Sequence, residues 1–384
     1  MQYICTMPDS LHIADFLEPL QPAIISNDEL FHDGQIGKNI MTYEHDLPDI
    51  QAADVIIVGC AERRGLHPFK QEASLNNIRQ EFYKLYHWHG PLSIADIGNI
   101  RTGASLNDTY AAVKTIVKEV SSLKKSLVII GGSHDLTLAQ YNAYTERGVI
   151  IEAVCVDAKI DLDLNSPSPS DHFLMEMLTG EPNFIRHYNH IGFQSYFVHP
   201  QMLETLDKLR FDCYRLGKVR ENMEEMEPVI RHADLFSFDI NAIANAWCPS
   251  NELSPNGFSG DEACALMRYA GMSHTNCSVG IYGYDSDRDP LRMTAKQISQ
   301  MLWYFIEGKS KGTREAGIQD KDAFNEYHTA FAEVATTFLQ SKRTGRWWMQ
   351  LPDQQFIACS YNDYILASSN EIPERWLRAQ ERTV

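Results

Sequence analysis

Four side chains that could bind a metal ion stand at the ends of apolar runs in this sequence: His134, Asp157, Asp161 and Asp239. The histidine follows the run SLVIIGG, the first two aspartates follow IEAVCV, and the third ends LFSFD. One imidazole with three carboxylates suits a hard cation, and Mn²⁺ is the expected ion. Lys159 lies between the first two aspartates, so the sequence puts an ammonium group inside an acidic cluster.

Short apolar runs rich in β-branched residues recur along the chain and predict buried strands at 53–60, 126–135, 151–161, 189–196, 235–241 and 277–285. Helical periodicity separates them, at 74–88, 107–123, 136–148, 223–233, 259–272, 295–308 and 322–340. Asn107 and Ser259 are predicted N-caps. This alternation predicts a three-layer α/β/α domain with a doubly wound, mainly parallel sheet, whose ligands bind at the carboxyl ends of the strands.

We expect this single domain to span residues 1–345, of which the first 50 are irregular. Residues 346–384 begin with the aromatic-rich stretch RWWMQLPDQQF, which has no clean period. They are predicted to form a C-terminal appendage packed on the domain, with a subunit contact as the alternative.

The composition bounds the classes of partner. The chain of 384 residues is 44% hydrophobic and carries a net charge of −17, which argues against nucleic acid or an anionic membrane as a partner. We find no signal peptide and no apolar run long enough to cross a membrane. The eight cysteines are scattered without a CxxC pair, which fits a reducing, cytoplasmic setting.

Three motifs in order resemble the arginase/ureohydrolase family, which includes arginase, agmatinase and formimidoylglutamase. They are GGSHD (131–135), DAKID (157–161) and SFDIN (237–241), and the similarity runs from about residue 53 to 290. The resemblance implies the ureohydrolase fold and a site for two manganese ions. It assigns His134, Asp157, Asp161 and Asp239 to the first ion, and makes the first and last of those aspartates bridging ligands to the second.

The chain departs from the family pattern where the second ion would bind. The family's histidine and aspartate are replaced by Lys159 and Asn241, and Gly283 aligns with the glutamate that grips a guanidinium-like substrate. His172 aligns with a substrate-loop histidine, although its neighbours do not fit that motif. These three, Lys159, His172 and Asn241, are candidate catalytic residues. Arg63 and Arg64 in AERRG could hold a substrate carboxylate, or simply be surface arginines.

Charge and donor chemistry both argue against a second ion. Three carboxylates, one divalent ion and one ammonium sum to −3 + 2 + 1 = 0, so Lys159 and Asn241 look like one coordinated change. A protonated amine has no lone pair and cannot bind a metal. At ~4 Å with an effective dielectric of about 20, it would repel a second divalent ion by about 8 kcal/mol.

We therefore expect at most one divalent ion, Mn²⁺ being the best candidate. A cation-free acidic cluster paired with Lys159 is the alternative. The favoured function is a ureohydrolase-fold protein that is not an active arginase and that binds a small amidine or acidic ligand without turnover. The alternative is a C–N hydrolase of the formimidoylglutamase type that uses at most one metal. The resemblance also implies a homo-oligomer. We interpret His87 and His89 as helix-end residues, and His187 and His190 as surface residues.

Overall fold

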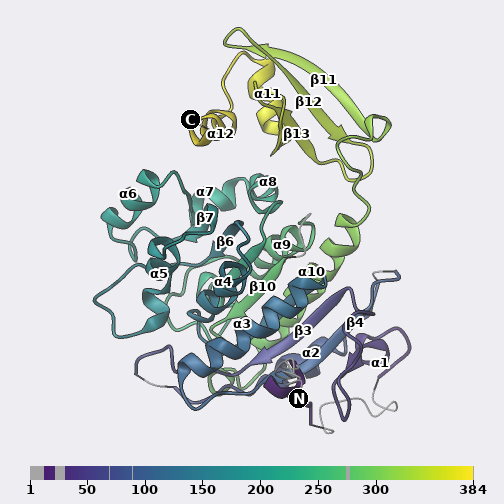
Figure 1. Cartoon of the computed structure of the whole chain (residues 1–384), viewed down its shortest axis with the longest axis vertical. Helices are drawn as coiled ribbons and strands as arrows, with labels where there is room; N and C mark the ends of the chain where they lie inside the picture. Colours follow the sequence, from purple (N-terminus) through teal and green to yellow (C-terminus); the bar gives the residue numbers. More distant parts are fainter. Residues whose placement is uncertain (1–12, 22–30, 69, 89, 274–276, 384) are drawn as a thin grey trace, which may run out of the picture.

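The computed structural model describes residues 13–21, 31–68, 70–88, 90–273 and 277–383. His89 and Cys5 lie outside these residues, as does much of the segment 1–50. The body contains a ten-stranded sheet with the order β1-β4-β3-β5-β10-β9-β6-β7-β8, and β2 also pairs with β4 (Figure 1). The strands are β1 (Leu17–Glu18), β2 (Met41–Thr42), β3 (Val55–Cys60), β4 (Ile94–Ile100), β5 (Ser126–Ile130), β6 (Ile151–Val156), β7 (Ile185–Phe193), β8 (Asp212–Arg215), β9 (Leu235–Asp239) and β10 (Ser278–Tyr282).

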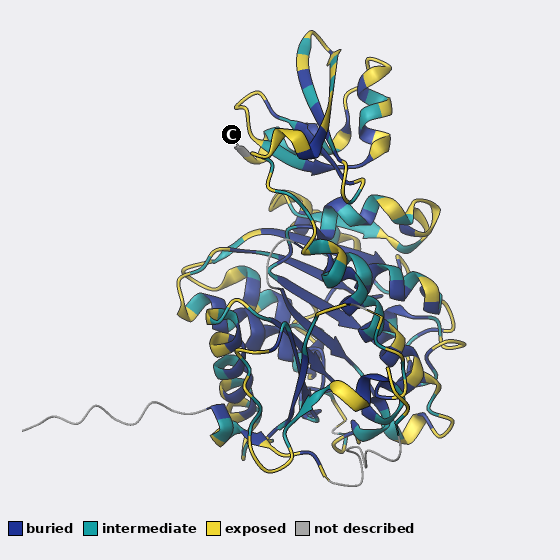
Figure 2. Cartoon of the chain, turned by 90° about the vertical axis from the view of Figure 1, so that its right-hand side faces the viewer, coloured by how far each residue is buried: buried dark blue, intermediate teal, exposed yellow. Residues whose placement is uncertain are grey.

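All neighbouring strands run parallel except β1, which is antiparallel to β4. Helices cover both faces of the sheet, and Figure 2 shows the strands buried between them. Side chains of α2 (Asn76–Phe82), α8 (Met226–Ile230), α9 (Gly260–Gly271) and α10 (Met293–Gly312) join one hydrophobic cluster. Those of α3 (Leu106–Ser122), α4 (Leu136–Glu146), α5 (Phe173–Thr179) and α6 (Pro200–Lys208) join the other. The three-layer α/β fold is therefore confirmed.

Strand β3 shows why a strand covered on both faces is an apolar run in the sequence. All six of its residues are buried, and successive side chains point to opposite faces of the sheet. Val55 and Ile57 enter one hydrophobic cluster, whereas Ile56 and Val58 enter the other. Because helices cover both faces, neither set of side chains meets water, and alternation with polar residues is lost.

Sequence reasoning missed four strands of this sheet: the two-residue strands β1 and β2, and β4 and β8. In β4 the apolar run is interrupted by Asp96, which is nevertheless fully buried. The Arg79 Nε donates to an Asp96 Oδ2 at 2.8 Å, and the Tyr83 hydroxyl donates to the same oxygen at 2.9 Å. A carboxylate that is paired in this way can be buried, but its partners lie on another element and no local pattern reveals them.

Two helix N-caps were predicted, and the structure confirms one of them and contradicts the other. Ser259 caps α9 in a capping box with Glu262, as expected. The cap of α3 is Ser105, whose hydroxyl accepts from the backbone N of Asp108, so Asn107 was the wrong residue. The segment predicted as a helix at 223–233 is a short 3-10 turn, Met223–Glu225, followed by α8.

The predicted helix at 322–340 is wrong. This segment forms the hairpin β11 (Phe324–Phe331) and β12 (Val334–Ser341). The two loop residues, Ala332 and Glu333, have φ of 47° and 64°. A two-residue loop with positive φ at both positions matches the twist of paired strands, so it closes a hairpin and breaks a helix.

A C-terminal unit follows this hairpin. It contains an antiparallel sheet of β11, β12, β13 (Trp347–Gln350) and β14 (Phe356–Cys359), followed by α11 (Tyr361–Ser368) and α12 (Glu374–Thr383) (Figure 1). The expected division at residue 345 falls between β12 and β13, which are paired strands of one sheet. The segment 324–341 belongs to this unit, because hydrogen bonds between β12 and β13 and shared hydrophobic clusters join it to the aromatic segment.

The C-terminal unit packs on the body through buried arginines. The Arg231 guanidinium lies 4.5 Å from the centroid of the Trp348 ring and donates to the Trp347 carbonyl at 2.7 Å. From the other side, Arg346 Nη1 donates to the Met272 carbonyl at 3.0 Å. The aromatic segment therefore packs on the body of the same chain.

Within the described ranges, no helix is both long and apolar enough to span a membrane.

Candidate metal centre

The metal-binding candidates meet at the carboxyl ends of β5, β6 and β9. The chain leaves β5 through Gly131, whose φ is +84° and where an added Cβ would lie 2.3 Å from a methyl carbon of Leu75. This position therefore requires glycine, and the turn that it allows brings His134 back over the strand ends. Asp157 directly follows β6, and Asp239 is the last residue of β9, the neighbouring strand.

The four predicted ligands form one buried cluster around the imidazole of His134. Its Nδ1 lies 2.9 Å from Asp161 Oδ2, 3.4 Å from Asp157 Oδ2 and 3.6 Å from Asp239 Oδ2. The structure therefore brings together all four side chains selected from the sequence.

Ser237 fixes the orientation of that imidazole. Its hydroxyl is hydrogen-bonded with His134 Nε2 at 2.9 Å and with the Thr137 hydroxyl at 2.6 Å. The other face is restricted by Phe173, whose ring lies edge-on to the imidazole with centroids 4.8 Å apart. With Nε2 engaged, Nδ1 faces the three carboxylates. Neighbours of this kind commonly orient histidines that bind metals. Ser237 and Phe173 were not identified from the sequence.

Burial makes the cluster costly while it holds no cation. Burial and the adjacent Asp161 carboxylate raise the pKa of Asp157. Burial and the Asp157 carboxylate raise the pKa of Asp239 to about 6. Burial by itself would lower the pKa of His134. Cys155 and the neighbouring aspartates raise it by more than burial lowers it, so the pKa lies well above its ordinary value. A proton or a cation is therefore favoured at this position.

The donor set fits one divalent cation. Single ligand atoms of His134, Asp157 and Asp239 all lie within 4.8 Å of one another. His134 Nδ1 and Asp161 Oδ2 are buried and lie 2.9 Å apart, but they are not aligned for a hydrogen bond with each other or with any other described residue. One imidazole nitrogen and several carboxylate oxygens suit Mn²⁺.

Lys159 has a different partner from the expected one. Its ammonium group forms an ion pair with Asp171, and its side chain is 35% exposed. Asp171 also accepts from the Ser166 hydroxyl at 2.6 Å. The ammonium still interacts electrostatically with the cluster: burial lowers the pKa of Lys159, but Asp161 and Asp171 raise it well above its ordinary value. The lysine therefore stays protonated beside the candidate metal ligands rather than bridging them.

Asp171 lies on a loop that is fixed to the metal centre. Asp135, next to His134, accepts from the Ser170 hydroxyl at 2.6 Å, and the Ser170 backbone N donates to the Gly65 carbonyl at 3.1 Å. Burial raises the pKa of Asp171, but the hydrogen bond from Lys159 lowers it below its ordinary value. Asp171 is the site residue that sequence reasoning passed over, because it lies twelve positions from its partner and outside every matched motif.

The two remaining positions where the chain departs from the family lie against Asp239. The Asn241 backbone N donates to Asp239 Oδ1 at 2.7 Å. Gly283 has φ of +89°, and an added Cβ would lie 3.0 Å from the same carboxylate oxygen. Both therefore adjoin the metal centre. His172 stands at the start of α5 and is half-buried; its Nδ1 has no hydrogen-bond partner within the described part of the chain.

The two candidate substrate arginines already have internal partners. Arg63 is buried, and its Nη2 lies 2.7 Å from Asp285 Oδ2. The Arg64 Nε donates to Glu62 Oε1 at 2.9 Å, and its Nη1 to the Ala104 carbonyl at 2.9 Å. Binding a substrate carboxylate would require either guanidinium to exchange these contacts, so the role predicted for them stays a prediction.

His190 is part of the buried support of the site, contrary to its interpretation as a surface residue. Its Nε2 lies 3.2 Å from the Asp157 carbonyl, and its Nδ1 is hydrogen-bonded with the Tyr188 hydroxyl at 2.9 Å. Burial lowers the pKa of His190 to about 4, so it is neutral at pH 7. His187 is buried as well. Both lie on β7, which is covered on both faces.

Comparisons with known proteins agree with this geometry. The sequence profile of the arginase family matches residues 55–307. The chain belongs to the arginase family. The matched region contains all four candidate ligands and ends before the C-terminal unit. Comparison with curated protein sequences gives no match.

Several solved structures of this family share the fold. Formiminoglutamase from Trypanosoma cruzi, determined with Mn²⁺, is 17% identical with a TM-score of 0.60, covering 69% of this chain and 99% of its own. Formimidoylglutamase from Bacillus subtilis is 15% identical, with a TM-score of 0.61, and covers 72% and 92%. Proclavaminate amidino hydrolase from Streptomyces clavuligerus is 20% identical, with a TM-score of 0.57, and covers 69% and 96%.

Proposed function

We propose that this arginase-family protein holds a single divalent cation, Mn²⁺ in the first place, and is not a two-metal hydrolase. The ligands would be His134, Asp157, Asp161 and Asp239. The observation that carries the proposal is the protonated Lys159, held by Asp171 beside this cluster. An ammonium offers no lone pair, so position 159 supplies no ligand to a second ion.

The ion pair changes the charge balance expected from the sequence. With Asp171 included, four carboxylates, one ammonium and one divalent ion sum to −4 + 1 + 2 = −1, not zero. Asp171 also offsets the repulsion that Lys159 would exert on another cation. The argument against a second ion therefore rests on missing donors at Lys159 and Asn241 more than on charge.

The residues of the crevice support binding more than hydrolysis. When bound, one divalent ion supplies Lewis-acid polarisation of a carbonyl or amidine group. Ser237 holds the imidazole of His134 toward the carboxylates, and Lys159 would contact an acidic ligand by exchanging its ion pair with Asp171. Gly283 provides no carboxylate for a guanidinium. We therefore propose a small-molecule ligand with an acidic or amidine group, bound without cleavage of its C–N bond.

Metal content tests this proposal directly. Full-length protein equilibrated with MnCl₂ and analysed by mass spectrometry should contain one Mn²⁺ per chain, and His134→Ala should contain none. Arginine, agmatine and formiminoglutamate should release no urea, ammonia or formamide above background. Two Mn²⁺ per wild-type chain would overturn the proposal. Turnover with one ion would establish the alternative, a single-metal hydrolase of the formimidoylglutamase type.

Two further proposals concern the setting of the protein. The seven cysteines within the described residues are all free thiols, and most are buried, which supports a reducing, cytoplasmic compartment.

Assembly into a homo-oligomer is supported by the exposed aromatic residues Tyr86 and Trp88, which adjoin Trp303 and Tyr304. Light scattering of wild type and Trp88→Ser would test the assembly.

A further inference from the structure

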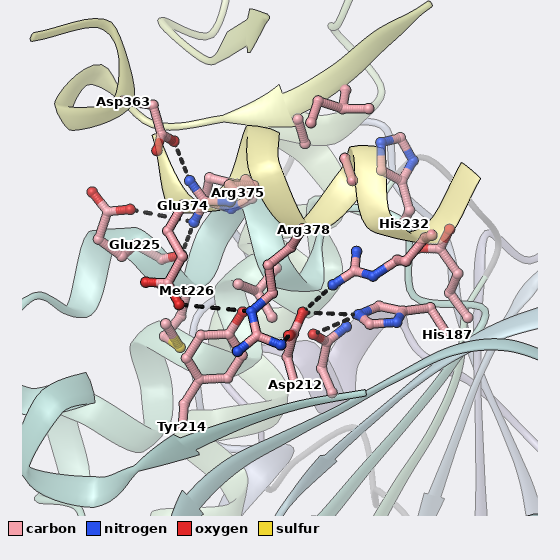
Figure 3. Close-up of a pocket in the computed structure, with 18 of the residues that line it drawn as sticks. His187, Asp212, Tyr214, Glu225, Met226, His232, Asp363, Glu374, Arg375 and Arg378 are labelled. Atoms are coloured by element: carbon pink, nitrogen blue, oxygen red, sulfur yellow. Dashed lines mark hydrogen bonds and ion pairs between the residues drawn. The ribbon is translucent and has the colours of Figure 1, made fainter. Parts of the chain in front are cut away.

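A cavity of about 730 Å³ lies between the body and the C-terminal unit (Figure 3). On the body side it is lined by residues at the amino ends of β6, β7 and β8, namely Glu152, His187 and Asp212. The metal centre is at the opposite ends of these strands. Glu152 and Asp157 are five residues apart on one strand, or roughly 16 Å. The volume is that of a typical small-molecule site.

Helix α12 closes the cavity with three arginines. Arg375, Arg378 and Arg382 are three and four residues apart, so they share one face of the helix. Figure 3 shows Arg375 and Arg378 extending from α12 toward the body. In a chain of net charge −17, this face is a local concentration of positive charge.

Arg378, Arg382 and His187 all contact the carboxylate of Asp212. Arg378 Nη1 lies 3.3 Å from Asp212 Oδ1, Arg382 forms an ion pair with the same side chain, and His187 Nε2 lies 3.2 Å from Asp212 Oδ2. Burial raises the pKa of Asp212, but these partners lower it below its ordinary value, so it is ionised. Two guanidiniums carry about ten N–H donors, more than one carboxylate can accept.

The other carboxylates of the cavity leave this excess in place. Glu225 and Asp363 share Arg375, and Glu152 lies 3.1 Å from Arg186 Nη2, so these three carboxylates pair with cations other than Arg378 and Arg382. Arg378 is also 3.6 Å from Glu374 Oε1 and 3.6 Å from Asp207 Oδ1, but these two side chains are 69% and 70% exposed, where an ion pair is weak. The anion-binding capacity is therefore concentrated at Arg378 and Arg382.

The wall of the cavity also carries an unpartnered polar atom. The His187 side chain is 10% exposed, and its Nδ1 has no hydrogen-bond partner in the described part of the chain. Apolar side chains complete the lining: Met226, Val229, Ile357, Leu366 and Ala379.

We infer that this cavity binds a small organic anion, whose carboxylate or phosphate group contacts Arg378 and Arg382 and whose apolar part packs on the body side. The bound anion joins α12 to the sheet and so stabilises the position of the C-terminal unit. This site is separate from the metal centre and does not depend on the function proposed for it.

Isothermal titration of the full-length protein tests the inference with phenyl phosphate and 3-phenylpropionate, and with benzyl alcohol as the neutral control. Both anions should bind more tightly than the alcohol, and the tighter of the two identifies the anionic group. The double variant Arg378→Gln/Arg382→Gln should weaken binding by at least about tenfold, because charge-assisted hydrogen bonds are lost. Arg343→Gln is the matched control, since Arg343 is an exposed arginine of the same unit, 3.7 Å from Asp320.

A second variant separates binding from folding. Ala379→Trp retains every arginine of α12 and fills the cavity, so it should abolish binding of both anions while the thermal midpoint without ligand stays near that of wild type. Equal binding of benzyl alcohol and the anions would overturn the inference. So would undiminished binding by Ala379→Trp or by the double arginine variant.

Discussion

Replacing Lys159 by His and Asn241 by Asp in the same chain should create a second Mn²⁺ site. The change removes a positive charge, adds a negative one and supplies two ligand donors, one next to Asp157 and one next to Asp239. Adding the glutamate at 283 would confuse the test: Gly283 has φ of +89° and its Cβ would lie 3.0 Å from Asp239 Oδ1. A left-handed conformation costs about 1–2 kcal/mol for other residues.

The magnitude follows from the charge at position 159. A unit charge ~4 Å from a divalent ion contributes about 8 kcal/mol at an effective dielectric of about 20. Lys159 is 35% exposed and is paired with Asp171, so solvent and the pair screen much of this. We take ~2–4 kcal/mol as the net repulsion that is removed. That energy corresponds to a gain of roughly 30-fold to 1,000-fold in affinity for the second ion.

Equilibrium dialysis against MnCl₂, followed by metal analysis, measures the stoichiometry. Wild type should saturate at one ion per chain and the double variant at two. Lys159→Met is the matched control, because it removes the charge without adding a donor and should stay at one. If Lys159→Met alone binds two ions, repulsion rather than missing donors excludes the second ion. If the double variant stays at one, our account of positions 159 and 241 is refuted.

Three more predictions follow from the packing. Ser237→Ala removes the partner of His134 Nε2 and should weaken Mn²⁺ binding by about 10–100-fold in the same dialysis, with near-wild-type secondary structure by circular dichroism. Burial by itself would raise the pKa of Glu227. Arg231 lowers it by more than burial raises it, so the pKa lies below its ordinary value. This contribution to stability is therefore complete above the unfolded pKa near 4.3 and is lost as the pH falls through the lower folded value. Urea midpoints from pH 7 to 3 should accordingly drop more for wild type than for Glu227→Gln, and parallel curves would contradict the assignment. Trp348→Ala should cost about 3–5 kcal/mol in urea unfolding, because the ring is 1% exposed and lies under Arg231.

The fold could be predicted where burial is uniform along an element. β3, β5, β6 and β9 are buried almost throughout and stand in the sequence as mainly apolar runs. β4 could not be predicted, because Asp96 is buried against Arg79 and Tyr83 from a different element. The hairpin at 324–341 was taken for a helix because the positive φ of Ala332 and Glu333 leaves no signature in residues of those types.

The site divides in the same way. Each metal-ligand candidate lies at the end of a strand or within five residues after it, and parallel strands bring such ends together, so the cluster around His134 could be predicted. Asp171, Ser237 and His190 could not be selected, since a hydroxyl, a loop acid and a strand histidine are common residues without a distinctive spacing. Their roles depend on which side chains face them.

The sequence by itself determined which atoms are available: four candidate metal ligands, an ammonium at Lys159 and an amide at Asn241, because chemical type is a property of each residue alone. Only the tertiary structure decided where the ammonium points. Its partner Asp171 lies on a loop held by contacts of Asp135 with Ser170. The cavity under α12 was likewise decided by tertiary structure, because its walls come from strands and helices that are far apart in the chain and meet only when the C-terminal unit packs on the body.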